Sequence, residues 1–280
     1  MTRTIDLHHR GLDRVIAAHE IGEVIVDPGP ASSVETLVAG LENEPRAVLL
    51  THIHLDHAGA TGTLVERYPS LQVYVHEIGA PHMADPSKLV ASASRIYDDI
   101  EELWGRTLPV PEENLTVLTG GERVEGFRVE HTPGHASHHV TFLHEESGDA
   151  FVGDVAGVRV PPSPYTIAPT PPPEVDVEAW ERSLDTVASL GARRLRLTHF
   201  GEVDDPGAQL GLMREALQRN SERARTLDRE AFFVEIAAEL EASASDEAAQ
   251  RFRQAVPPEH LWLGLERYWR KREEHESGDG

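Results

Sequence analysis

The sequence contains no cysteine, and this absence excludes several kinds of site. Disulfide frameworks, thiolate zinc sites, cysteine nucleophiles and cysteine-ligated iron–sulfur clusters all need a thiol. The sequence also has no convincing G-x-S-x-G motif, the turn that presents a serine nucleophile in many hydrolases. If the protein is an enzyme, we expect it to work without a covalent intermediate on its own side chains.

Positive charge and long apolar runs are also scarce. The chain has 26 Lys and Arg residues against 48 Asp and Glu residues, so its formal net charge is −22. Binding to nucleic acid or to anionic lipid rests on Lys and Arg, so we expect a small-molecule partner instead of nucleic acid or a membrane. No stretch approaches the roughly 18 apolar residues of a membrane span, and the first residues lack the apolar segment of a signal peptide. We therefore expect a cytoplasmic protein.

Short apolar runs bounded by Gly, Pro and Asp predict a series of strands with helices between them. The strands are predicted at residues 14–19, 23–26, 47–51, 71–75, 115–118, 127–130, 139–144, 150–152 and 194–198. The helices are predicted at residues 32–42, 58–68, 87–104 and 178–190. This mixture indicates a layered α/β arrangement in which helices cover sheets. From residue 206 the pattern is helical, so we expect a catalytic domain at 1–205 and a helical extension at 206–280 packed on it.

The 16 histidines are the outstanding feature, and their clustering is informative. The segment Thr-His-Ile-His-Leu-Asp-His-Ala-Gly at residues 51–59 follows an apolar run. In an extended segment His52, His54 and Asp56 point to the same side, while His57 turns away as a helix begins. Imidazole and carboxylate groups suit zinc and similar metals. One tetrahedral ion cannot easily use four such groups from so short a loop, so two adjacent ions fit better.

Three further residues of the same chemistry follow, each at a predicted strand end. His135 comes after the tight turn Thr-Pro-Gly, Asp154 after Phe-Val-Gly, and His199 after the strand at 194–198. The carboxylate of Asp154 has two oxygens and can bridge two cations. Residues on loops at strand ends are the usual way in which a rigid scaffold presents a site.

These motifs, in this order, resemble the metallo-β-lactamase superfamily over residues 6–201. The resemblance implies a four-layer αββα sandwich, followed here by the C-terminal helices. It implies ligands for a first metal at His52, His54 and His135, ligands for a second metal at Asp56, His57 and His199, and a bridge at Asp154. Asp27, in the turn Asp-Pro-Gly, resembles the carboxylate that orients a liganding histidine of this family.

The other candidate residues belong to the surroundings of the site. His131, His138 and His139 are interpreted as supporting or structural; relatives frequently carry Gly at the position of His138, which makes it a candidate for the pocket wall. Residues 77–111 and 161–173 are expected to border the substrate cleft, and Tyr97 or Tyr165 could donate a hydrogen bond there. Six further histidines are expected at the surface: His8, His9, His19, His144, His260 and His275.

Two adjacent cations can lower the pKa of a water held between them from about 15.7 towards neutrality. The resulting bridging hydroxide would attack a carbonyl or phosphorus, while a metal stabilises the oxyanion. Asp56 and Asp154 are the expected catalytic residues, with Asp56 orienting the hydroxide. Two divalent ions are expected as cofactors, zinc first, with iron or manganese as the alternatives.

The resemblance to the glyoxalase II-like, lactonase-like and general hydrolase branches implies cleavage of an ester, thioester or lactone of a small molecule. A β-lactamase is disfavoured because those enzymes are normally exported. A phosphodiesterase of the same fold is disfavoured by the net charge of −22. A persulfide-dioxygenase-like oxidoreductase, which holds a single iron, is disfavoured by the complete second set of ligands. An exposed aromatic face around Trp262 and Trp269 favours a homodimer.

Overall fold

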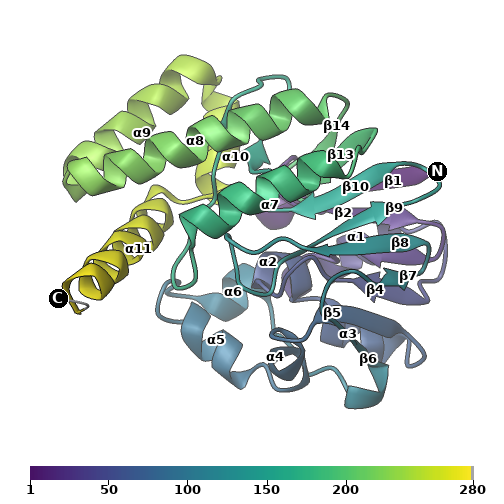
Figure 1. The fold of residues 1–280 in the computed structure, drawn as a ribbon. Helices are drawn as coiled ribbons and strands as arrows, with labels where there is room; N and C mark the ends of the chain where they lie inside the picture. The colour runs from purple at the N-terminus through teal and green to yellow at the C-terminus, as the bar shows by residue number, and fades with distance from the viewer. Residues whose placement is uncertain (279–280) are drawn as a thin grey trace.

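The computed structural model describes residues 1–278, with side chains described as far as His275. Two six-stranded sheets lie face to face, and helices cover their outer surfaces (Figure 1). The first sheet has the order β1 (Thr2–Asp6), β2 (Ala17–Ile21), β3 (Val24–Val26), β4 (Ala47–Leu49), β5 (Gln72–His76) and β6 (Leu115–Leu118). Its first three strands are antiparallel, and β3 to β6 run parallel.

The second sheet has the order β14 (Gly201–Val203), β13 (Arg194–Leu197), β10 (Asp149–Gly153), β9 (Val140–His144), β8 (Phe127–His131) and β7 (Arg123–Val124). Only its β10–β13 pair is parallel. A separate hairpin joins β11 (Val158–Arg159) to β12 (Thr166–Ile167). Because β10 and β13 run in the same direction, the residues that follow them emerge at the same edge of this sheet.

The two sheets are held together by a shared apolar core. Val26 and Leu49 of the first sheet meet Phe127, Phe142 and Phe151 of the second, and all five side chains are buried. Side chains alternate between the faces of a strand, so the same strands also supply residues to the outer faces. Burying each of these side chains contributes roughly 1.5–3 kcal/mol, which makes this core the main attachment between the sheets.

Short helices cover the outer face of the first sheet. They are α1 (Val34–Gly40), α2 (Leu55–Ala58), α3 (Thr61–Arg67), α4 (Ala80–Ala84), α5 (Ser87–Ala93) and α6 (Ile100–Trp104). Short 3₁₀ helices span His9–Gly11, Ala31–Ser33 and Glu112–Asn114. The second sheet is covered by α7 (Val177–Ser189) and α8 (Pro206–Thr226), which lie along each other in Figure 1. The four-layer sandwich expected from the sequence is confirmed.

The remaining C-terminal helices are α9 (Arg229–Ser243), α10 (Asp246–Ala255) and α11 (Pro258–Gly278), and they share an apolar cluster around Phe232 and Phe252. The guanidinium of Arg251 bonds to Asp13, and the amide of Gln254 donates to the backbone oxygen of His9, 2.7 Å away. These bonds attach α10 to the N-terminal segment. The last helices therefore pack directly on the sandwich.

Two features of the helical region bear on the expectations from the sequence. The apolar face of α8 contributes Met213 and Leu217 to the cluster that covers the second sheet, so the outer layer of the sandwich continues past residue 205. The aromatic face expected to be free for a partner subunit is partly covered: Trp262 packs on Phe232, and the indole of Trp269 donates to the backbone oxygen of Ser221. Both rings stay partly exposed, and the homodimer stays a prediction.

None of the helices in residues 1–278 combines the length and the apolar character that crossing a membrane requires.

Candidate metal centre

The seven side chains predicted as metal ligands come together at one end of the sandwich, on loops that follow strands. The His52–His57 segment follows β4 and enters α2, and His135 lies between β8 and β9. Asp154 and His199 follow β10 and β13, the two neighbouring parallel strands. The sheets thus bring to one place residues that are up to 147 positions apart in the chain, counted from His52 to His199.

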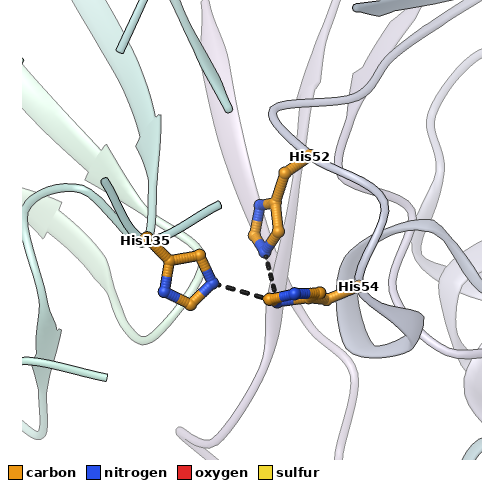
Figure 2. A group of neighbouring side chains, drawn as sticks. All are labelled: His52, His54 and His135. Carbon is orange, nitrogen blue, oxygen red and sulfur yellow. Dashed lines mark hydrogen bonds between the residues drawn. The ribbon is translucent and has the colours of Figure 1, made fainter. Parts of the chain in front are cut away.

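His52, His54 and His135 form the first group of donors. Nε2 of His52 lies 3.1 Å from Nδ1 of His54, and Nε2 of His135 lies 2.9 Å from the same Nδ1. Figure 2 shows the three rings pointing at one another, although they come from two separate loops. Three imidazole nitrogens at such distances surround a point that a single cation can occupy.

Asp56, His57 and His199 form the second group. Nε2 of His199 lies 3.2 Å from Oδ2 of Asp56, and Nε2 of His57 lies 3.8 Å from that oxygen. Asp56 lies in the first turn of α2, one residue before His57, so the helix start directs neighbouring side chains to the same space.

Asp154 lies between the two groups and presents one oxygen to each. Its Oδ2 is 3.2 Å from Nε2 of His135 in the first group. Its Oδ1 is 3.3 Å from Nε2 of His57 and 3.7 Å from Nε2 of His199 in the second group. This is the geometry of a carboxylate that can bind two cations at once.

Outer hydrogen bonds fix which ring nitrogen of three histidines faces the centre. Nδ1 of His135 is 2.9 Å from the backbone oxygen of Pro169, and Nδ1 of His199 is 2.6 Å from that of Val15. A carbonyl oxygen only accepts, so each Nδ1 carries the proton and each Nε2 offers its lone pair inward. The carboxylate of Asp27 holds His57 in the same way, with Nδ1 of His57 2.8 Å from its Oδ2.

Asp27 itself is fully buried and has donors on both oxygens. The backbone N–H of Thr51 donates to Oδ1, and the hydroxyls of Thr51 and Thr198 donate to Oδ2, at 2.7 and 2.8 Å. The carboxylate therefore ties the strand ends before His52 and before His199 to the ring of His57. This is the place that the resemblance implies for an orienting carboxylate.

The donors fit a pair of metal ions on chemical grounds. Nε2 of His57 and Oδ1 of Asp154 are buried and have no hydrogen-bond partner. Leaving a buried polar atom unpaired costs about 1–3 kcal/mol, and a cation bound to both atoms would remove that cost. The donor atoms lie within 4.8 Å of one another in the first group, in the second group, and in the set of His52, His57 and Asp154. The clusters are therefore consistent with a dinuclear metal site.

The protonation states are also consistent with a dinuclear metal site. Burial, together with the neighbouring imidazoles, lowers the pKa of His52 well below its usual value and that of His54 to about 4. Burial alone would lower the pKa of His57 as well, but the carboxylates of Asp154, Asp56 and Asp27 outweigh it and raise that pKa. The first group is thus neutral and ready to bind a metal, and the second lies in a negative field that favours a cation.

A cavity of about 290 Å³ opens over these donors. His54, Asp56, His135, Asp154 and His199 form its floor. Most of its other lining residues are apolar, and the majority of these come from three segments: residues 89–104, residues 169–173 and residues 255–257.

Two of the three predicted pocket residues line this cavity. Tyr97 is among them, and its pKa is raised by burial and further by the carboxylates of Asp56 and Asp154, so the phenol is un-ionised and close to the metal donors. His138 also lines the cavity; it is buried, and its Nδ1 has no partner. Tyr165 does not: it packs on Phe252, with ring centroids 5.3 Å apart, in the cluster of the C-terminal helices. Its predicted place in the pocket is corrected accordingly.

The other two histidines near the motif support the site. Nε2 of His131 donates to the backbone oxygen of Ser137, and the ring stacks on His76 with centroids 4.4 Å apart. His139 lies under the bridging residue, because its Nε2 accepts from the backbone N–H of Asp154 at 3.3 Å.

Several histidines interpreted as surface residues are in fact buried. His9, His19 and His260 are at most 8% exposed, so the surface prediction was wrong for them. Nothing in their local sequence marks them, because their burial depends on segments packed on them from elsewhere in the chain. His260 lines the cavity, and His9 stacks on Trp104 with centroids 5.1 Å apart.

Thr51 and Thr198, which precede His52 and His199, were not predicted to take part in the site. The repeated Thr-His pair at 51–52 and 198–199 was the available signal, since both hydroxyls bond to Asp27.

Comparison with known proteins gives a consistent result. Residues 15–199, well over half of the chain, match the model of the metallo-beta-lactamase superfamily. A hydroxyacylglutathione hydrolase of Xylella fastidiosa is 37% identical over 121 residues, which cover 43% of this chain and only 36% of that protein. The chain therefore spans about a third of the length of these curated relatives.

Solved structures agree on the fold. The archaeal superfamily protein ST1585 from Sulfolobus tokodaii has a TM-score of 0.71 at 22% identity, covering 94% of this chain and 97% of that one. TTHA1623, solved in a di-iron-bound form, has a TM-score of 0.53 at 31% identity, covering 72% of this chain and 93% of that one. On the strength of its fold, its converging donors and these matches, the chain belongs to the metallo-β-lactamase superfamily.

Proposed function

We propose that this protein is a binuclear metal-dependent hydrolase that cleaves an ester, thioester or lactone of a small molecule. The observation that carries the proposal is the position of Asp154, which offers one oxygen to each group of imidazole donors. Such an arrangement serves two ions, with His52, His54 and His135 holding one, and Asp56, His57 and His199 holding the other.

When bound, the two cations would supply an activated water and polarise the carbonyl group. In the overall reaction the water oxygen forms a bond to the acyl carbon, and the acyl C–O or C–S bond breaks. The products are a carboxylate and an alcohol or thiol; one proton of the water ends on the leaving group, and the other is released to the solvent. No side chain of the protein needs to form a covalent bond.

The protein's own groups would hold and orient the reactants. Oδ2 of Asp56 faces the cavity floor beside His199, so it can accept a hydrogen bond from the attacking water. The hydroxyl of Tyr97 lines the same cavity and is un-ionised, so it can donate to the carbonyl oxygen or to the leaving atom. His138 borders the floor near His54 and is positioned to contact the substrate.

Zinc is our first choice of metal. Histidine and carboxylate ligands also accept iron and manganese, and the di-iron form of TTHA1623 favours iron as the second candidate. A single-iron oxidoreductase is the rival function. A site with a single iron would leave Asp56, His57 and His199 without a metal. The donor atoms of these residues nevertheless lie within 4.8 Å of one another, as do those of the first group.

Elemental analysis of the purified protein, followed by assays with and without chelator, tests the proposal. Two ions per chain and chelator-sensitive hydrolysis of thioesters, lactones or esters are expected. One iron per chain with oxygen uptake, or cleavage of phosphodiesters alone, would refute it. The variants Asp154→Ala and His54→Ala should lose turnover and metal, whereas His275→Ala, at an exposed position on α11, should keep both.

A further inference from the structure

The wall of the cavity is apolar where it rises above the metal donors. Leu89 and Ala93 of α5 and Ile96 just after it form one part of this wall. Val256 and Pro257, at the junction between α10 and α11, form another part. Both segments lie outside the loops that carry the metal donors, so the wall can recognise a part of the substrate that does not react.

The lining of the cavity has few Lys or Arg side chains that could bind an anionic group. Within residues 1–278, Lys88 is the only lysine or arginine that lines the cavity, and its side chain is exposed. The carboxylate of Glu174 also lines the cavity, and the whole chain carries a net charge of −22. A glutathione conjugate, which carries free carboxylates, would find no cluster of basic side chains here.

The size of the cavity limits the substrate further. Its volume of about 290 Å³ lies at the lower edge of the usual range for ligand pockets, about 300–1,000 Å³. An apolar chain of a few methylene groups fills such a space, and each methylene that it buries strengthens binding about fourfold. The reacting carbonyl would lie at the floor, next to Asp56 and Asp154.

Resting on the hydrolase function proposed above, we propose that the substrate is a carboxylic ester or thioester with an uncharged, apolar acyl chain of medium length. This chain lies between α5 and the α10–α11 junction, and Ala93 and Val256 determine the length that fits. The C-terminal helices thereby take part in substrate selection, while the metal donors come from the sandwich.

A series of acyl esters of one alcohol, from acetyl through butyryl and hexanoyl to octanoyl, tests this with the metal-loaded full-length protein. We expect kcat/KM to rise at least tenfold from acetyl to hexanoyl or octanoyl, and to exceed the value for a hydroxyacylglutathione. Equal or higher kcat/KM for the acetyl ester or for the glutathione thioester would overturn the proposal and leave the hydrolase function standing.

Variants locate the acyl chain. Ala93→Trp fills the cavity from α5, and we expect it to lower the octanoyl-to-acetyl ratio of kcat/KM at least tenfold. Ala91→Trp, at an exposed position of the same helix, should leave the ratio unchanged. Val256→Trp fills the cavity from the α10–α11 junction, and it replaces Ala93→Trp as the test if that variant does not fold. An unchanged ratio in every folded cavity variant would overturn the proposal.

Calorimetry with free carboxylates separates this proposal from the catalytic one. If octanoate binds at least tenfold more tightly than acetate and Ala93→Trp removes the difference, the acyl site stands even if no ester is turned over. Equal binding of both carboxylates, in a protein without turnover, would overturn both proposals.

Discussion

At the scale of single residues, hydrogen bonds on the side away from the metal centre orient three histidines of the site. In His135 and His199 the nitrogen that faces away from the centre donates to a backbone oxygen, and in His57 it donates to Asp27. Each such bond fixes both the ring orientation and the tautomer, so the inner nitrogens are ready to bind before any cation arrives. Losing one outer partner should therefore weaken metal binding without removing a ligand.

Asp27→Asn tests this directly. The amide keeps the size of the side chain, but its –NH₂ group would face hydroxyl and imidazole donors that now bond to a carboxylate oxygen. We expect metal affinity to fall about 10- to 100-fold, measured by competition with a chromophoric chelator.

Thr198→Val is the matched control, because it removes one donor to Asp27 and leaves the bond to His57 in place. It should cost far less affinity than Asp27→Asn. Wild-type affinity in Asp27→Asn would show that the carboxylate does not act through His57.

The buried imidazole of His19 should make the free energy of unfolding depend on pH. Its Nε2 donates to the backbone oxygen of Leu197, 3.1 Å away, and burial lowers its pKa to about 4. The unfolded chain takes up this proton near pH 6.5, earlier than the folded protein does. The free energy of unfolding should therefore fall as the pH drops from about 6.5 to 4, by about 3 kcal/mol for this residue.

Urea unfolding of metal-free wild type and of His19→Gln, at pH 7, 5.5 and 4, measures this contribution. Glutamine keeps a donor for Leu197 but does not titrate. The variant should lose less stability than the wild type between pH 7 and pH 4, since the other buried histidines are common to both proteins. Identical pH dependence in the two proteins would rule out the assignment to His19.

At the scale of elements, the turn before His135 is pressed against α7. Gly134 has φ +136°, and a Cβ atom built there would lie 2.4 Å from Cα of Trp180. The backbone N–H of Asp176, the N-cap of α7, donates to the oxygen of Gly134. Helix α7 therefore positions the His135 turn through contact with the backbone itself.

Gly134→Ala should destabilise the protein by at least about 2 kcal/mol, because it combines an unfavourable φ with a collision. Gly191→Ala is the control: it has φ +62° but open space around the built Cβ, so about 1 kcal/mol is expected. Urea unfolding compares the two variants, and elemental analysis should show metal loss for Gly134→Ala alone. Equal effects would mean that the contact with α7 is unimportant.

The elements themselves were largely predictable from local patterns. The run at 115–118 coincides with β6, and the predicted strand at 127–130 differs from β8 by one residue. The predicted helix at 87–104 is two helices, because Asp99 caps α6 by accepting from the N–H of Glu102. β1 was missed: this five-residue edge strand has only one fully buried side chain, Ile5, so it lacks an apolar pattern.

At the scale of the whole molecule, helix α8 completes the outer layer of the sandwich over the second sheet. Met213 and Leu217 of α8 share a core with Trp180 of α7 over the second sheet. A chain that ends at Asp205 would leave this core open to water and lose several buried apolar side chains, each worth roughly 1.5–3 kcal/mol.

We therefore expect a fragment of residues 1–205 not to fold into a stable sandwich. Near-ultraviolet circular dichroism and binding of a hydrophobic dye should show lost tertiary packing and exposed apolar surface, with the full-length chain as the control. A cooperative unfolding transition close to that of the full chain would contradict this expectation.

The metal donors and the substrate cavity differed in how far the sequence predicted them. All seven predicted donors lie in short motifs at strand ends, where local pattern and chemistry agree, and the fold brings them together. Two segments of the cavity wall, around Leu89 and Pro171, fall within residues 77–111 and 161–173, which were expected to border the cleft. The third segment, around Val256, lies far away in the chain, and no local pattern connects it to the site. Tyr165 was misplaced for the same reason, since only the packing of α10 shows that its ring lies on Phe252.

Part of the cavity wall lies outside the region that matches the family model, and this has an evolutionary consequence. The donors come from loops of the sheets, whereas Val256 and Pro257 belong to a region beyond residue 199, where the match to the family model ends. Descendants of this chain could exchange or rebuild their last helices and acquire new substrates while inheriting the cleavage chemistry intact. Diversification would then proceed by changing helices α10 and α11, with the metal-binding motifs left unchanged.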